Sequence, residues 1–272
     1  MNKYKAYCTD LDGTLFDNEG RLSPENEKAI EELVKMGVIF VPTTGRTIKE
    51  LPPCIKNNEN VRYIIYSNGA GVLDRYTGWK SEELVDAEKA KAIFDILSDY
   101  NVLITVHKDT DCFINGEALS VSENYSVNGG YIQIFKTLTI IKENFMSFAK
   151  GLGAVEMICV FFGKDVNSKE CISRLQKISG IAMTSSISGN VEIISESTNK
   201  GSGVRRLAEH VGISSEEIIG VGDQKNDIDL LNAVGCPLAV SNASPELKAV
   251  AKEIICKNTE HSVKYVLDKF FK

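Results

Sequence analysis

The first third of the chain alternates short apolar runs with a longer amphipathic segment. Residues 4–9 form a short apolar-rich segment that predicts a strand. Residues 38–42 and 62–68 are hydrophobic runs, which predict strands covered on both faces in a parallel sheet. Residues 23–37 predict a helix, because a serine N-cap followed by proline opens the segment and a glycine ends it. Strands alternating with helices are typical of a doubly wound α/β fold.

The last third of the chain repeats this pattern. Residues 202–212 have apolar positions at helical spacing, and residues 216–223 supply another buried-strand run. A short helix, a strand and a further helix are predicted over residues 226–253. We therefore expect residues 1–85 and 189–272 to form one discontinuous domain, a Rossmann-like doubly wound parallel sheet with its helices.

Between these segments, helices and strands no longer alternate strictly. We expect an inserted α+β cap domain over residues 86–188, with a polar stretch at residues 120–130 that predicts no regular element. The helices expected there are residues 87–100, 139–150 and 168–179, and the strands are residues 101–108, 111–116, 155–163 and 181–188.

Charge and cysteine content argue against a nucleic-acid-binding protein and against a disulfide-bonded one. The 272 residues carry a formal net charge of -6, which argues against a protein that binds a nucleic-acid backbone. The seven cysteines are an odd number, widely spaced and without a C-x-x-C pair, so we interpret them as reduced thiols. No apolar run reaches membrane-span length, and the N-terminus lacks a signal-peptide pattern. We expect a cytoplasmic protein without a membrane, nucleic-acid or obligate protein partner.

The first candidate site is the sequence DLDGTL, which follows directly on the first predicted strand. Asp10 and Asp12 stand two apart, and carboxylates this close repel each other unless a cation shares their site. A plain Asx turn followed by a glycine turn would need neither both acids nor the preceding strand. A hard divalent ion with oxygen ligands is therefore the expected occupant.

Three further segments flank predicted strands or helices. In VPTTGR, the hydroxyl of Thr44 and nearby backbone N–H groups can bind an anion, although a plain turn explains this segment equally well on its own. Arg46 is a bidentate phosphate binder or simply a surface charge. In NKGSG, Lys200 begins a helix, where a cation is unfavourable against the helix dipole unless an anion lies nearby. Alone it would be interpreted as a solvated surface lysine, but together with the other segments it is interpreted as a group that neutralises phosphate.

The last segment, GVGDQKND, clusters acidic and amide side chains between a buried strand and a helix. Asp227 alone could be an N-cap, but Asp223 at the strand tip is then unexplained, and magnesium coordination explains it. The carboxyl ends of neighbouring parallel strands meet at one crevice, so we expect all four segments to converge.

These four segments, in this order and spacing, resemble the haloacid dehalogenase superfamily. The large insert and the SNGA sequence at residues 67–70 are similar to its Cof-type phosphatases, and the resemblance spans essentially the whole chain. It implies a magnesium-dependent phosphatase that hydrolyses phosphate monoesters of small metabolites through an aspartyl-phosphate intermediate. The expected substrate is a sugar phosphate or another phosphorylated metabolite such as a nucleotide or flavin mononucleotide.

The resemblance also implies residue roles. Asp10 would be the nucleophile, and Asp12 would be the general acid that later activates water as a base. Thr44 and Lys200 would bind the transferring phosphoryl group. Magnesium would be held by Asp10, the backbone carbonyl of Asp12 and Asp223, with Asn226 and Asp227 supporting it directly or through water. Further expected substrate contacts are Gly45, Arg46, Asn68 and Gly69.

Two other functions compete with this hypothesis. A phosphomutase of the same superfamily would move the phosphate rather than release it, and a non-catalytic regulatory protein would bind without turnover. The complete set of acidic, hydroxyl and lysine positions argues against the second. Substrate choice depends on the insert, where Asn115, Tyr125, Asn128 and Gly129 are candidates that one sequence does not rank.

Overall fold

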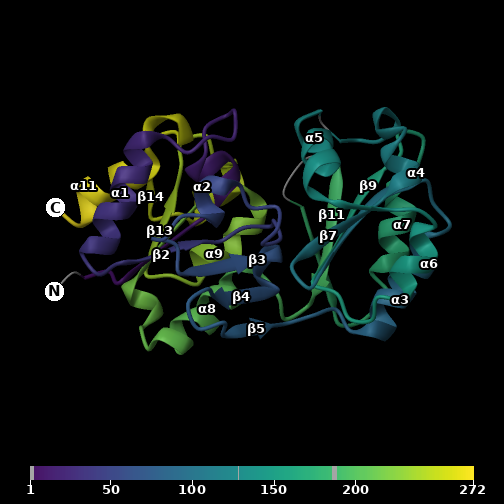
Figure 1. Ribbon diagram of the computed structural model, residues 1–272, viewed down its shortest axis with the longest axis horizontal. Coiled ribbons are helices and arrows are strands. Elements are labelled where there is room, and N and C mark those ends of the chain that lie inside the picture. Colours follow the sequence, from purple (N-terminus) through teal and green to yellow (C-terminus); the bar gives the residue numbers. More distant parts are fainter. Residues whose placement is uncertain (1–2, 128, 186–188) are drawn as a thin grey trace. The chain divides into compact units, whose positions relative to one another are not determined.

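The computed structural model describes residues 3–127, 129–185 and 189–272, so Asn128 lies outside the described residues. The chain divides into two compact units (Figure 1). The first contains the segment that ends at Gly45, together with Pro52–Ser81 and Asn199–Lys272. The second contains Arg46–Leu51 and Glu82–Thr198. The domain limits expected at residues 85/86 and 188/189 stay a prediction; the second unit also takes the short segment that begins at Arg46.

The first unit is built on a parallel sheet of five strands. Its spatial order is β14-β13-β12-β1-β2, and each neighbouring pair runs parallel. The order reverses direction at β1, which is the topological switch point of a doubly wound fold. The predicted Rossmann-like fold class is therefore confirmed. The strands are β1 (Ala6–Thr9), β2 (Ile39–Pro42), β12 (Ile218–Gly222), β13 (Cys236–Ala239) and β14 (Glu253–Ile254).

The hydrophobic run at residues 62–68 departs from the expected parallel strand. Only Tyr63–Tyr66 is extended, as β3, and one parallel bridge between Thr43 and Ile65 joins it to the end of β2. Ser67 and Asn68 have φ values of 47° and 53°, a left-handed conformation that turns the chain back into an antiparallel hairpin. The predicted strand is therefore present but shorter than expected, and the turn that ends it was not predicted. The added strands are β4 (Gly71–Asp74) and β5 (Lys80–Glu82).

Helices lie on both sides of the five-stranded sheet, with α1 and α11 on one side and α8 and α9 on the other (Figure 1). The side chain of Ser23 caps α1 by accepting a hydrogen bond from the N–H group of Asn26, as the sequence predicts. Gly212 ends α8 in the left-handed region, with φ of 71°. The helices are α1 (Pro24–Lys35), α2 (Pro53–Lys56), α8 (Lys200–Val211), α9 (Ile228–Asn232), α10 (Pro245–Val250) and α11 (Ser262–Phe270).

The second unit is a mixed sheet with helices on both faces. The order is β10-β11-β9-β6-β7-β8, and the pairs whose register is known are antiparallel except β7 with β8. Alternate residues of β6 point to opposite faces, so Ile104 packs with α3, α6 and α7 while Leu103 packs with α4 and α5. The strands are β6 (Val102–Lys108), β7 (Asp111–Asn115), β8 (Ile140–Lys142), β9 (Met157–Phe162), β10 (Ile181–Thr184) and β11 (Asn190–Ser195).

The helices of the second unit include two corrections. The helix expected over residues 139–150 is instead β8 followed by a shorter helix, because Asn144 adopts a left-handed conformation between them. A helix that begins at Gly129 was missed, since its first residues fall in the polar stretch without a periodic pattern. The helices are α3 (Ala87–Leu97), α4 (Gly116–Leu119), α5 (Gly129–Leu138), α6 (Phe145–Lys150) and α7 (Ser168–Leu175). None of the described helices is long and apolar enough to cross a membrane.

Candidate active site

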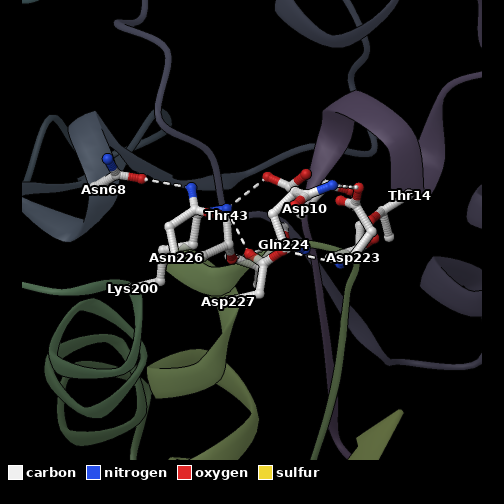
Figure 2. Close-up of polar contacts among 11 residues, drawn as sticks. Asp10, Thr14, Thr43, Asn68, Lys200, Asp223, Gln224, Asn226 and Asp227 are labelled. Atoms are coloured by element: carbon white, nitrogen blue, oxygen red, sulfur yellow. Dashed lines mark hydrogen bonds and ion pairs between the residues drawn. The ribbon is translucent and has the colours of Figure 1, made fainter. Parts of the chain in front are cut away.

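The site lies where two neighbouring parallel strands of the first unit end. Strands β1 and β12 pair with Thr9 opposite Val221, and the N–H group of Asp10 donates to the carbonyl of Val221 at 3.0 Å. Asp10 and Asp223 therefore leave adjacent strands at the same sheet edge, as the sequence pattern predicts. Figure 2 shows Asp10 between Asp223 on one side and Asp227 on the other.

The loop after β1 wraps around the side chain of Asp223. Leu11–Leu15 form one wide helical turn that is broken at Gly13, which has φ of 82°. A Cβ atom on Gly13 would stand 2.5 Å from Oδ2 of Asp223, so a side chain is excluded there by contact as well as by conformation. The hydroxyl of Thr14 donates to Oδ1 of Asp223 at 2.9 Å. The loop after β1 is therefore fixed to the loop after β12 through contacts with the side chain of Asp223.

The loop after β12 is organised by the buried carboxylate of Asp227. Its Oδ2 accepts hydrogen bonds from the N–H groups of Asp223 at 2.9 Å and Gln224 at 3.1 Å. Its Oδ1 accepts from the ammonium group of Lys200 at 2.5 Å. Asp227 is therefore more than an N-cap, because it ties the acidic loop to the start of α8.

Lys200 is a buried cation shared by two carboxylates. Its side chain is 1% exposed, and Nζ lies 2.6 Å from Oδ1 of Asp10 and 2.5 Å from Oδ1 of Asp227. Burial lowers the pKa of Lys200, but the two carboxylates outweigh it and hold the pKa above its usual range. Asn199 caps α8 and sets this position by accepting from the N–H group of Ser202.

The acidic residues carry more negative charge than Lys200 neutralises. Asp10, Asp223 and Asp227 each offer a carboxylate oxygen, and these atoms all lie within 4.8 Å of one another. Burial, reinforced by the neighbouring aspartates, raises the pKa of Asp10 well above its usual range despite Lys200. Burial and the charge of Asp227 raise the pKa of Asp223 to about 6. An oxygen-only, negatively charged donor set of this kind fits a hard divalent cation such as Mg²⁺.

The other predicted residues of the first unit lie around the turn after β3. The amide of Asn226 donates to Oδ1 of Asn68 at 3.1 Å (Figure 2). The N–H group of Asn68 donates to the carbonyl of Thr44 at 3.0 Å, and a Cβ on Gly45 would stand 3.2 Å from Oδ1 of Asn68. Gly69 lies against the backbone that opens α8, since its Cβ would meet a carbonyl at 2.1 Å. The structure therefore brings these five positions together.

Two predicted residues need separate description. Asp12 is partly exposed, and its charge is near enough to contribute to the raised pKa of Asp10. Arg46 belongs to the second unit, where its guanidinium donates to the carbonyl of Glu50 at 3.1 Å. The catalytic role of Asp12 and the phosphate contact of Arg46 stay predictions.

Sequence reasoning missed the role of Thr14. Its hydroxyl orients Asp223, although 209 positions separate the two residues in the chain. Thr14 stands within the DLDGTL sequence, but its partner depends on which strands are neighbours. Gln224, whose amide donates to Oδ2 of Asp223 at 3.3 Å, was also missed, although it is the next residue in the chain.

Comparison with known proteins gives the family. The family model described as haloacid dehalogenase-like hydrolase matches residues 7–267. The chain belongs to the haloacid dehalogenase-like hydrolases. The predicted superfamily and its Cof-type group are thereby confirmed.

Relatives of this haloacid dehalogenase-like hydrolase are named as phosphatases. The chain is 30% identical over 283 residues to 5-amino-6-(5-phospho-D-ribitylamino)uracil phosphatase YwtE of Bacillus subtilis, with 97% of each chain covered. It is 28% identical to phosphatase YwpJ of the same organism, covering 97% of this chain and 98% of the relative. The predicted enzyme class, a phosphatase of this superfamily, is confirmed.

Solved structures share the whole fold. A haloacid dehalogenase-like hydrolase from B. subtilis superposes with a TM-score of 0.81 at 25% identity, covering 97% of this chain and 99% of that one. A sugar phosphatase of subclass IIB of the superfamily superposes with a TM-score of 0.82 at 19% identity, covering 98% and 99%. The second likeness concerns the fold alone.

Proposed function

We propose that this haloacid dehalogenase-like hydrolase is a Mg²⁺-dependent phosphatase that hydrolyses phosphate monoesters of small metabolites through an aspartyl-phosphate on Asp10. The observation that carries the proposal is the buried constellation of Asp10, Lys200, Asp223 and Asp227 at the ends of β1 and β12. Three carboxylates around one lysine suit a site that receives both a divalent cation and a phosphate dianion.

The first chemical step assigns different roles to the two aspartates of the D-x-D sequence. A carboxylate oxygen of Asp10 attacks phosphorus, the ester P–O bond breaks, and Asp12 gives its proton to the departing alkoxide oxygen. Lys200 already binds Oδ1 of Asp10, so it holds the nucleophile in place and balances charge on the phosphoryl oxygens. The hydroxyl of Thr44 is proposed as a further donor to those oxygens.

The second step returns Asp10 to its starting state. Asp12, now ionised, removes a proton from water as the water oxygen attacks phosphorus, and the bond from phosphorus to Asp10 breaks to release inorganic phosphate. Asp10, Asp223 and the backbone carbonyl of Asp12 would hold Mg²⁺, with Asn226 and Asp227 in support. The ion supplies positive charge that offsets the phosphoryl negative charge.

The name of a relative supports the proposed substrate class. One relative is a phosphatase named for a phosphorylated ribitylamino-uracil. We propose sugar phosphates and related polyol or nucleotide phosphates, flavin mononucleotide included, as the compounds to test first. A phosphomutase would instead convert one phosphate ester into an isomer of the same mass.

The test is a screen of phosphorylated metabolites with Mg²⁺, in which both free phosphate and organic products are measured. We expect stoichiometric phosphate release by the native protein and loss of turnover in Asp10→Asn. Asp229→Asn is the matched control, because Asp229 is an exposed aspartate in α9 of the same unit. Isomer formation without phosphate release would favour the mutase, and full activity of Asp10→Asn would refute the nucleophile assignment.

A further inference from the structure

The second unit contains a separate cluster of metal-ligating side chains. Glu50, His107 and Cys112 each offer one ligand atom, and these atoms lie within 4.8 Å of one another. The three residues are 5%, 4% and 1% exposed. All three residues belong to the second unit, whereas Asp10, Asp223 and Asp227 belong to the first.

Two of the ligands come from a rigid hairpin. His107 of β6 and Cys112 of β7 are directly opposite each other in the antiparallel register. Side chains in such a pair point to the same face, with Cβ atoms about 4.5–5.5 Å apart. The turn between the strands is Asp109 and Thr110, with φ values of 51° and 69°. The buried carboxylate of Glu156 accepts from the N–H group of Thr110 at 2.9 Å and fixes this turn.

The third ligand is carried by a segment that is fastened to the same hairpin. The ammonium group of Lys49 forms an ion pair with the carboxylate of Asp111 at 2.6 Å. The backbone N–H group of Lys49 donates to the carbonyl of Thr110 at 3.3 Å. The next residue is Glu50, whose Oε2 accepts from both the N–H group and the hydroxyl of Thr47, at 2.9 and 3.0 Å. The carboxylate is therefore oriented before any ion arrives, which lowers the cost of binding.

The distance between the nitrogen and oxygen ligand atoms fits a small transition-metal ion. Nε2 of His107 lies 3.7 Å from Oε2 of Glu50, which is longer than a hydrogen bond between these atoms. Two ligand atoms at about 2.1 Å from a tetrahedral zinc ion are roughly 3.4 Å apart, close to this separation. Imidazole and thiolate favour zinc-type ions over Mg²⁺, which prefers oxygen ligands.

We propose that Glu50, His107 and Cys112 form a binding site for Zn²⁺ or a similar borderline transition-metal ion. The three side chains supply one oxygen, one nitrogen and one sulfur ligand, and a water molecule completes four-coordination. Cys112 binds as a thiolate, so its proton is released to solvent when the metal enters. The metal joins the segment at Lys49 and Glu50 to the β6–β7 hairpin.

The competing explanation is a buried polar network that only fastens this segment and binds no ion. Co²⁺ distinguishes the two, because thiolate-to-cobalt charge transfer produces near-ultraviolet absorption only when sulfur binds the metal. The titration uses the full chain with Mg²⁺ in excess, so that the oxygen-only site of the first unit is occupied. Competition of Zn²⁺ against Co²⁺ then gives the zinc affinity.

The matched variants are Cys112→Ser and Cys159→Ser. Cys159 is also buried on the hairpin-bearing sheet, in β9, but is not one of the three proposed ligands. We expect Cys112→Ser to lose the charge-transfer band and at least about tenfold in zinc affinity, while Cys159→Ser matches the native protein. Glu50→Gln and His107→Gln should weaken zinc binding while keeping the band, and they carry the test if Cys112→Ser does not fold.

Two results would overturn the proposal. One is a native protein that shows no thiolate-to-cobalt absorption at saturating Co²⁺. The other is a band that persists in Cys112→Ser or disappears in Cys159→Ser, which would assign the sulfur ligand to another cysteine.

Discussion

Asp223→Asn should make the metal-free protein more stable while it abolishes phosphatase activity. The pKa of Asp223 is raised from 3.8 to about 6 by burial and by the charge of Asp227. A difference of about two pKa units between the folded and unfolded chain corresponds to about 3 kcal/mol of unfolding free energy lost above pH 6. Asparagine has the same shape and can still accept the hydrogen bond from Thr14.

The pH dependence of this effect has a definite sign. Between about pH 4 and pH 6 the folded state keeps a proton on Asp223 that the unfolded chain has released. The unfolding free energy of the metal-free native protein therefore falls as pH rises through this window. Asparagine does not titrate, so the advantage of the variant should be largest above pH 6 and should disappear near pH 4.

Urea denaturation in EDTA at pH 8 and pH 4 measures this difference. We expect Asp223→Asn to exceed the native protein by up to about 3 kcal/mol at pH 8, with no clear gain at pH 4. Asp229→Asn, which changes an exposed aspartate, should stay within about 0.5 kcal/mol of the native protein. A variant no more stable than native at pH 8, or equally stabilised at both pH values, would refute the reasoning.

Three further predictions follow from the same site. The affinity for Mg²⁺, measured by calorimetry, should fall as pH drops below about 6, because protons then compete for Asp223; a flat profile from pH 5 to pH 8 would contradict this. Lys200→Met should lower the unfolding free energy, measured by urea denaturation without metal, by about 3–5 kcal/mol, since two buried carboxylates lose their cation. A loss under about 1 kcal/mol would show that these ion pairs are exposed to solvent. Gly13→Ala should weaken Mg²⁺ binding and lower the melting temperature, because its Cβ would stand 2.5 Å from Asp223 at a φ of 82°. Gly20→Ala is the control, since Gly20 has a similar φ of 75° but open space around its Cβ. The control therefore measures the conformational strain without the contact to Asp223.

The sequence predicted those parts of the site that depend on local pattern. Asp10 and Asp223 each follow a short buried run, and parallel strands that are neighbours bring such positions to one edge. Lys200 was inferred from an unfavourable position at a helix start, and the structure supplies the two carboxylates that compensate it. The helix-start position indicated that Lys200 needs an anion, but phosphate was the anion expected, and Asp10 and Asp227 were not foreseen as its partners.

The parts that were missed depend on contacts distant in the chain or on single backbone conformations. The hydrogen bond from Thr14 to Asp223 could not be seen before the strand order was known. The left-handed turn at Asn68 converts a hydrophobic run into a hairpin, and asparagine is common in turns of many kinds. Glu50 contacts the hairpin at His107 only because its segment folds with the second unit, and no hydrophobic period records that choice.

The central claim, that Asp10 carries the phosphoryl group, is tested most directly by trapping the intermediate. In Asp12→Asn, a substrate with a good leaving group such as p-nitrophenyl phosphate should still phosphorylate the enzyme, whereas the missing base slows release. Borohydride reduction of the quenched protein converts an aspartyl-phosphate to homoserine, which peptide mass spectrometry locates. We predict homoserine at position 10. Phosphate release without reduction at that position, or with reduction at another aspartate, would contradict the account.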